Sequence, residues 1–326
     1  MKHALAVLAL LLLLVPEARG RAQQTPTVTA LTAEWPEIVK VDGIEILRVQ
    51  KDVYMLVGGG ANVTAQVGSE GVMLVDAGAP GQTAKILAAL RHVTKKPLRY
   101  LVNTSADLDK IGGNADIVKA AGGVSGPGAP DRPANVGIAT FAHENAVNRM
   151  MKPPALTGDA LPASTFFTPR KDFYANGEAV QLFHEPKAHT DGDVIVFFRG
   201  SDVVSTGDIF RTDSYPVIDA ARGGTIQGEL NALNAILDIT VPERNQMGGT
   251  RVVPGHGRIC NEADVLEYRD MLTIIRDRVR DMTKKNMTLA QVKAAHPALE
   301  YDGLYGTQKD WTGEMFLEAV YREFAR

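Results

Sequence analysis

The sequence predicts an α/β fold in which β-sheets pack in the centre and helices lie outside. Short β-rich runs bounded by glycine and aspartate begin at Ile44, and apolar residues at helical spacing follow them. The same order, strands and then helices, returns in the second half of the chain. The 326 residues are 45% hydrophobic and 22% charged, which is typical of a globular protein with a sizeable core. Two such halves in one chain favour a layered arrangement.

The first half predicts strands at residues 44–49, 53–57, 62–67 and 72–75, in the manner of a meander. Apolar residues at helical spacing then predict a helix ending near Val93, followed by a strand at 98–102 and a short helix at 115–121. Residues 122–168 are rich in glycine, proline and alanine. They predict a loop that carries one helix around residues 142–151.

The second half predicts strands at residues 179–183, 194–198 and 203–205, a helix at 226–239 and a last short strand at 251–253. The tail predicts helices at 263–285, 289–295 and 314–324. We therefore expect residues 37–326 to form a single domain with a helical extension over about residues 262–326.

The first 22 residues have the pattern of a signal peptide. Lys2 and His3 precede an apolar run from Ala4 to Val15, and small residues typical of a cleavage site follow up to Ala22. This run of about 12 residues is shorter than the roughly 20 that a membrane-spanning helix needs, which favours cleavage over anchoring. Residues 23–36 form a polar, proline-containing lead. We expect an exported protein, periplasmic or secreted, with no membrane association after cleavage.

Charge and cysteine content exclude several classes of function. Thirty-five Lys and Arg residues stand against 38 Asp and Glu residues, a net charge of −3 with no basic stripe, which argues against a nucleic-acid partner. The single thiol, Cys260, excludes an intramolecular disulfide and a multi-cysteine zinc site. The chemistry must therefore use histidine, carboxylate, serine or lysine, and we expect the substrate to be a small molecule.

Five polar clusters come directly after predicted strands. They are Asp76, the run from Ser105 to Lys110, the run from His189 to Asp193, Asp208 after Gly207, and His256 between Gly255 and Gly257. Loops on a rigid scaffold carry function, and the neighbouring glycines permit the tight turns that bring short side chains inward. We expect these clusters to converge on one site if the strand ends meet at one edge.

In these clusters the sequence resembles the metallo-β-lactamase fold superfamily, which includes glyoxalase II. The resemblance covers roughly Val53 to His256 and implies a four-layer αββα sandwich, with mixed sheets inside, helices outside and a metal site at the sheet edge. Asp76 in Leu-Val-Asp-Ala-Gly is similar to the family's structural aspartate. His189 in Ala-His-Thr-Asp-Gly-Asp is similar to its third histidine, Asp208 to its bridging aspartate, and His256 in Pro-Gly-His-Gly to its last histidine.

The chain departs from the family in the hallmark loop Thr-His-x-His-x-Asp-His, which precedes Gly-Gly-Asn. Here the loop reads Ser105-x-Asp107-x-Asp109-Lys110, so three histidines are missing, whereas the flanking Thr104 and Gly-Gly-Asn are intact. The resemblance then implies that Asp107 replaces a histidine beside His189 and Asp208, and that Ser105 is a poor ligand. The metal ligands we predict are Asp107, Asp109, His189, Asp208 and His256, holding one or two ions. Zinc is the first choice, and manganese or iron(II) also suits two carboxylates with one imidazole.

Lys110 takes the place of a ligand, and a protonated ammonium cannot coordinate a metal. It either provides a fixed positive charge that replaces a metal and stabilises negative charge on the substrate, or neutralises the nearby carboxylates in a salt bridge. Asp109 can position or deprotonate a water, so Asp109 and Lys110 are the predicted catalytic residues.

Two functions remain open from the sequence. One is an exported metal-dependent hydrolase, in which a metal-activated water attacks an ester, thioester, lactam or similar bond. The other is a binding protein of the same fold with a degenerate metal site and no catalysis.

Overall fold

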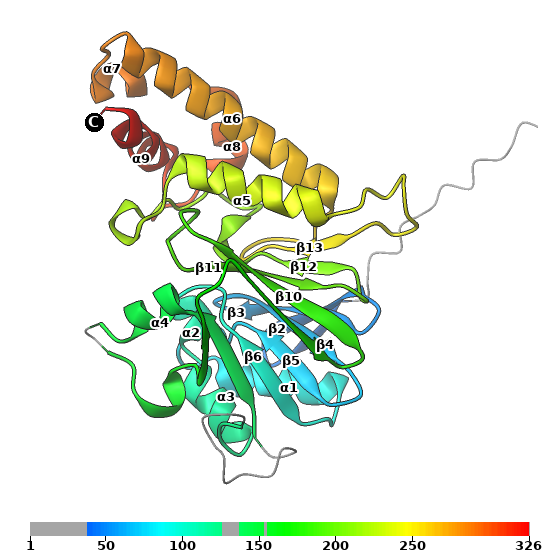
Figure 1. The fold of residues 1–326 in the computed structure, drawn as a ribbon. Helices are drawn as coiled ribbons and strands as arrows, with labels where there is room; N and C mark the ends of the chain where they lie inside the picture. The colour runs from blue at the N-terminus through cyan, green and yellow to red at the C-terminus, as the bar shows by residue number, and fades with distance from the viewer. Residues whose placement is uncertain (1–37, 126–136, 153–154, 326) are drawn as a thin grey trace, which may run out of the picture. The chain divides into compact units, whose positions relative to one another are not determined.

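The computed structural model describes residues 38–125, 137–152 and 155–325. The predicted signal peptide, residues 1–22, and the polar lead, residues 23–36, lie outside the described residues. Two β-sheets form the centre of this part of the chain, and helices lie on the outer face of each sheet (Figure 1).

The first sheet has eight strands in the order in which they occur in the sequence. They are β1 (Val39–Val41), β2 (Ile44–Gln50), β3 (Val53–Gly59), β4 (Ala61–Val67), β5 (Val72–Val75), β6 (Leu98–Val102), β7 (Ala139–His143) and β8 (Ser164–Phe166). The meander from β1 to β5 is antiparallel, and β5, β6, β7 and β8 run parallel to one another. Parallel strands need a crossover between them, which explains why helices enter the chain after β5.

The second sheet has five strands in the order β13-β12-β11-β10-β9. They are β9 (Arg170–Ala175), β10 (Glu178–Glu185), β11 (Asp193–Phe198), β12 (Val203–Ser205) and β13 (Arg251–Val253). Its neighbours pair antiparallel except β12 and β13, which are parallel. As a result β10, β12 and β13 all end at the same edge of the sheet.

Strand β5 illustrates how the layers form. All four residues of Val-Met-Leu-Val are buried, because successive side chains point to opposite faces and both faces are covered. Met73 and Val75 pack between the sheets against side chains of the second sheet such as Val194 and Val196. Val72 and Leu74 point the other way, into the core beneath α1 and α3.

The helices complete four layers, which confirms the predicted αββα sandwich. Helices α1 (Thr83–Val93) and α3 (Asn114–Ala120) cover the first sheet, and α5 (Ile226–Ile239), α6 (Glu262–Lys284) and α9 (Gly313–Phe324) share a core with the second (Figure 1). The remaining helices are α2 (Leu108–Ile111), α4 (Glu144–Met150), α7 (Leu289–Ala294) and α8 (Leu299–Tyr305). None of the helices in the described ranges is long and apolar enough to cross a membrane.

The segment 122–168 differs from its sequence prediction. It contains β7 and β8 as well as the expected helix, which begins at Glu144 and ends at Met150. These strands have only five and three residues, and they form by pairing parallel to β6 and to each other. Runs this short carry little periodicity, so the sequence pattern missed them. Strand β9 was missed as well, because its sequence is three charged residues followed by Phe-Tyr-Ala and so lacks the alternation that marks a strand.

Candidate metal centre

Polar residues from both sheets meet at one edge, as the sequence predicted. The loops after β5, β6, β10, β12 and β13 carry the five clusters, and these strands end on the same side of their sheets. Backbone hydrogen bonds join the two halves at this edge: Val194 N donates to Thr104 O at 2.8 Å, and Asn62 N donates to Gly255 O at 2.9 Å.

Asp76 shapes the loop after β6. Its two carboxylate oxygens accept hydrogen bonds from Thr104 N at 2.8 Å and Thr104 Oγ1 at 2.7 Å. Burial raises the pKa of Asp76 to about 7, although Lys110 and Thr104 act in the opposite direction. Gly207 packs on the same threonine with φ +54°, and a Cβ there would lie 2.5 Å from Thr104 Oγ1, which requires glycine. Asp76 therefore has a structural role: it holds Thr104, and through it the loop after β6.

Asp193 holds the loop of His189 in the same way. It accepts hydrogen bonds from Thr190 N at 2.6 Å and Thr190 Oγ1 at 2.8 Å. Burial raises the pKa of Asp193 to about 6, and the imidazole of His189 opposes that shift. Two buried aspartates, one under each sheet edge, thus orient the loops that present the site.

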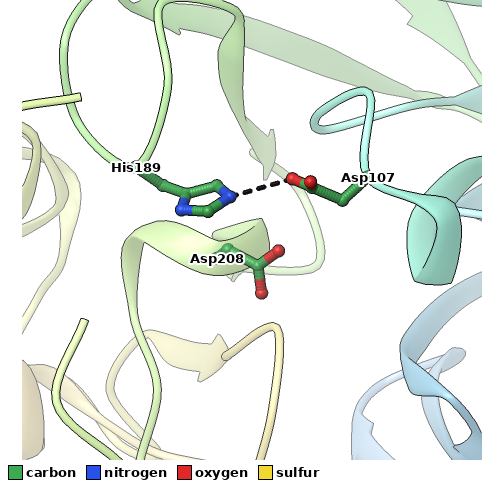
Figure 2. Close-up of side chains that lie close together, drawn as sticks. All are labelled: Asp107, His189 and Asp208. Carbon is green, nitrogen blue, oxygen red and sulfur yellow. Dashed lines mark hydrogen bonds and ion pairs between the residues drawn. The ribbon is translucent and has the colours of Figure 1, made fainter. Parts of the chain in front are cut away.

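Asp107, His189 and Asp208 form the first group of candidate ligands (Figure 2). One donor atom from each lies within 4.8 Å of the other two, and His189 Nε2 is 2.9 Å from Asp107 Oδ2. The three residues come from separate segments: the turn before α2, the loop between β10 and β11, and the short helix at Gly207–Ile209. One imidazole and two carboxylates make a donor set that suits zinc, manganese or iron(II).

The ring of His189 is held so that Nε2 faces the other donors. Its Nδ1 lies 2.5 Å from Val217 O, so Nδ1 carries the proton and donates to this carbonyl. This is the arrangement by which metal-binding histidines are commonly oriented. Burial lowers the pKa of His189, but the bond to Asp107 and the nearby carboxylates raise it to about 10 in the metal-free protein.

Asp107 has two further partners. Arg222 Nη2 lies 2.6 Å from Asp107 Oδ1, and Ser105 Oγ donates to Asp107 Oδ2 at 2.9 Å. Burial opposes ionisation of Asp107, but His189 and then Arg222 hold its pKa well below the usual range. Sequence reasoning missed Arg222, since nothing in the run that contains it distinguishes it from a surface arginine.

The loop that carries Arg222 is tied to the site through its backbone. Asp219 Oδ2 accepts from Arg222 Nε at 2.7 Å, and Asp219 N donates to His189 O at 3.0 Å. The next residues are Gly223, with φ +91°, and Gly224, where a Cβ would lie 2.2 Å from His189 O. These two glycines were the only available signal that the loop packs closely on the site.

Asp109, Asp208 and His256 form the second group of candidate ligands, which shares Asp208 with the first. His256 Nε2 lies 3.0 Å from Asp109 Oδ2 and 3.4 Å from Asp208 Oδ1. The site residues predicted from the sequence are thus all brought together at one centre.

Lys110 lies in the middle of this second group. Its Nζ is 2.9 Å from Asp109 Oδ2, 3.0 Å from Asp208 Oδ1 and 3.4 Å from His256 Nε2. The side chain is 0% exposed. Burial alone would lower the pKa of Lys110, but the carboxylates of Asp208 and Asp109 raise it above its usual value, so the amine is an ammonium.

Comparison with known proteins agrees with this geometry. The family model of the metallo-beta-lactamase superfamily matches residues 56–256. This chain belongs to the metallo-β-lactamase superfamily. No curated protein sequence matches the chain.

Solved structures of the superfamily share the fold at low sequence identity. The sec-alkylsulfatase Pisa1 from Pseudomonas sp. has a TM-score of 0.63 and 16% identity, over 86% of this chain and 50% of that chain. The metallo-β-lactamase DIM-1 gives 0.55 and 16%, over 72% of this chain and 99% of its own. A metallo-β-lactamase from Pontibacter korlensis gives 0.52 and 18%, over 73% and 98%. The chain therefore spans about half the length of the alkylsulfatase and nearly the whole of the lactamases.

Proposed function

We propose that this superfamily member is an exported, metal-dependent hydrolase of a small molecule, with a divalent ion held by Asp107, His189 and Asp208. The observation that carries the proposal is the convergence of these three donors within 4.8 Å, with His189 Nε2 directed at the other two. The orientation of the ring by Val217 O supports it, because this bond leaves Nε2 as the coordinating atom. We take zinc as the first choice, with manganese or iron(II) as alternatives.

The residues of the centre fit such an ion. Asp208 Oδ1 faces Lys110, whereas no described residue bonds to its Oδ2, which leaves that oxygen for the ion. Asp107 Oδ1 is held by Arg222, so coordination would use Oδ2, the oxygen next to His189. A bound ion supplies Lewis acidity, polarising the oxygen of the bond to be broken and making water more acidic.

Asp109 orients the attacking water in this proposal. Its side chain is 30% exposed, and its Oδ1 accepts no hydrogen bond from the described residues. Burial disfavours its charge, but His256 and Lys110 hold the pKa of Asp109 well below its usual range, so it stays ionised and is a weak base. Its role is therefore to accept a hydrogen bond from water rather than to store a proton. Lys110 is enclosed, so it acts on the substrate only through the carboxylates that it contacts.

The bond cleaved is an ester, thioester, lactam or similar bond, and the fold alone selects none of them. The similarity to an alkylsulfatase over 86% of this chain adds sulfate esters to the substrates worth assaying. Residues 1–22 are the proposed export signal, and expression with this segment should yield protein beginning at Arg21 or Gln23.

Elemental analysis of the purified protein tests the proposal together with a hydrolysis panel of carboxylic, thio- and sulfate esters and a β-lactam. We expect stoichiometric metal that is lost in both His189→Ala and Asp208→Ala, with hydrolysis of a panel member lost in parallel. A folded protein that takes up no zinc, manganese or iron would contradict it.

A further inference from the structure

Two groups of three donors lie side by side at this centre and share Asp208. They differ in what surrounds them. In the first group the guanidinium of Arg222 contacts one carboxylate oxygen, Asp107 Oδ1, whereas in the second group the ammonium of Lys110 contacts an atom of all three residues.

The ammonium matches the second group in the number of its N–H donors and in the sign of its charge. It has three N–H donors and no acceptor, and the three neighbouring atoms are two carboxylate oxygens and an imidazole nitrogen. A buried charge is tolerated when it is paired and hydrogen-bonded, and Lys110 has both forms of compensation. Its full burial removes the competing water that would weaken these interactions.

A metal ion would need the same atoms. His256 Nε2 has one coordinating lone pair at most, and this atom either faces Lys110 as an acceptor or donates to Asp109. In neither state is Nε2 available to an ion. An ion would also bring its positive charge next to the ammonium in an enclosed site, where like charges repel strongly.

We propose that Lys110 is a built-in cation that fills the second position, so that this protein binds a single divalent ion. The ammonium compensates Asp109 and Asp208 in place of a second ion, and Asp208 divides its oxygens between Lys110 and the first position. The part of the inference that concerns the first position rests on the proposed function, whereas the part that concerns Lys110 rests on the contacts of its Nζ.

The test is the number of zinc equivalents bound after saturation with zinc and gel filtration. We expect one equivalent in the wild type and in His256→Ala, and none in His189→Ala, because only the first group coordinates. Lys110→His replaces the ammonium by a ligand and should bind two equivalents, and the added equivalent should disappear in Lys110→His combined with His256→Ala. Circular dichroism and urea unfolding verify that each variant is folded.

The outcomes separate this inference from the proposed function. Two equivalents in the wild type, or a loss of zinc in His256→Ala, would overturn the inference. Neither outcome depends on whether Lys110→His folds. A folded Lys110→His that binds no more zinc than the wild type would also overturn it. In a third outcome the wild type binds no zinc, Lys110→His binds one equivalent, and this equivalent disappears when His256→Ala is added. That outcome would support the role of Lys110 and reject the proposed first position.

Discussion

His189 Nε2 lies 2.9 Å from Asp107 Oδ2, although 82 residues separate them in the sequence. The bond joins the loop of one sheet to the loop of the other and brings together two donors of the proposed first position (Figure 2). Arg222 and Ser105 hold Asp107 from one side, and Val217 holds His189 from the other.

Asp107→Asn keeps the shape of the side chain and removes its negative charge. We expect its zinc affinity, measured by competition with a chromogenic chelator, to fall by at least about 100-fold, since the loss of groups that merely orient metal ligands already costs about 10- to 100-fold. Ser105→Ala removes a hydrogen bond to Asp107 but no donor, and should lower the affinity by about tenfold or less. Equal affinities of Asp107→Asn and the wild type would exclude Asp107 as a ligand.

Arg222→Ala removes the cation that pairs with both Asp107 and Asp219. Leaving two partly buried carboxylates without their partner should lower the free energy of unfolding of the metal-free protein by about 1–3 kcal/mol. Added zinc should stabilise the variant more than the wild type, because the ion supplies positive charge to Asp107. Arg322→Ala, which removes an exposed helical ion pair, is the matched control and should change stability by at most about 0.5 kcal/mol. Equal zinc stabilisation of Arg222→Ala and the wild type would contradict the compensation of the Asp107 charge by Arg222.

Glu229 on α5 is 0% exposed, and its two carboxylate oxygens lack a hydrogen-bond partner among the described residues. Burial raises the pKa of Glu229 well above its usual value, so the folded state holds a proton that the unfolded state releases above pH 4.5. The contribution of Glu229 to the stability should therefore fall as the pH rises above 4.5, whatever the other titrating groups contribute. Glu229→Met should raise the free energy of unfolding at pH 8 by about 1–3 kcal/mol and remove the part of the pH dependence that Glu229 contributes.

Urea unfolding at several pH values between 5 and 8 measures the effect of Glu229. Asp238→Asn, at an exposed position of the same helix, is the control and should leave the slope unchanged. A destabilised Glu229→Met would mean that the carboxyl has a favourable partner in the folded protein.

His143 stacks on His184 with ring centroids 3.4 Å apart and an interplanar angle of 10°. Burial, and then the charge of His184, lower the pKa of His143 to about 4, and Asp191 opposes this shift only in part. Because its pKa in the folded state lies below that in the unfolded state, the stability that His143 contributes should be lost as the pH falls from 6.5 to 4. The loss due to this group is on the order of 3 kcal/mol.

His143→Asn keeps an acceptor for Asn145 N at the start of α4 and removes the titrating ring. Its stability should fall less between pH 7 and pH 4 than that of the wild type, as measured by urea unfolding. His92→Asn, at an exposed position, should retain the pH dependence of the wild type. If His143→Asn also retained it, the acid sensitivity would come from other groups.

Much of the fold was predictable because many of its strands and helices have recognisable local sequence patterns. The continuous apolar run of β5 identifies a strand covered on both faces, and the spacing of apolar residues in α6 identifies one face of a long helix. Strands β7 and β8 were not predictable, since they are too short for a period and exist by pairing with β6.

The sequence by itself determined which residue types follow the strand ends, and therefore that carboxylates, imidazoles and one lysine would meet at the sheet edge. It left two roles open for Lys110 and gave Arg222 none. The tertiary structure decided that Nζ of Lys110 lies among Asp109, Asp208 and His256, and that Arg222 pairs with Asp107. The physical reason is that the order of residues along a strand follows from local geometry, whereas the pairing of buried charges depends on distances between segments that only the packed sheets bring together.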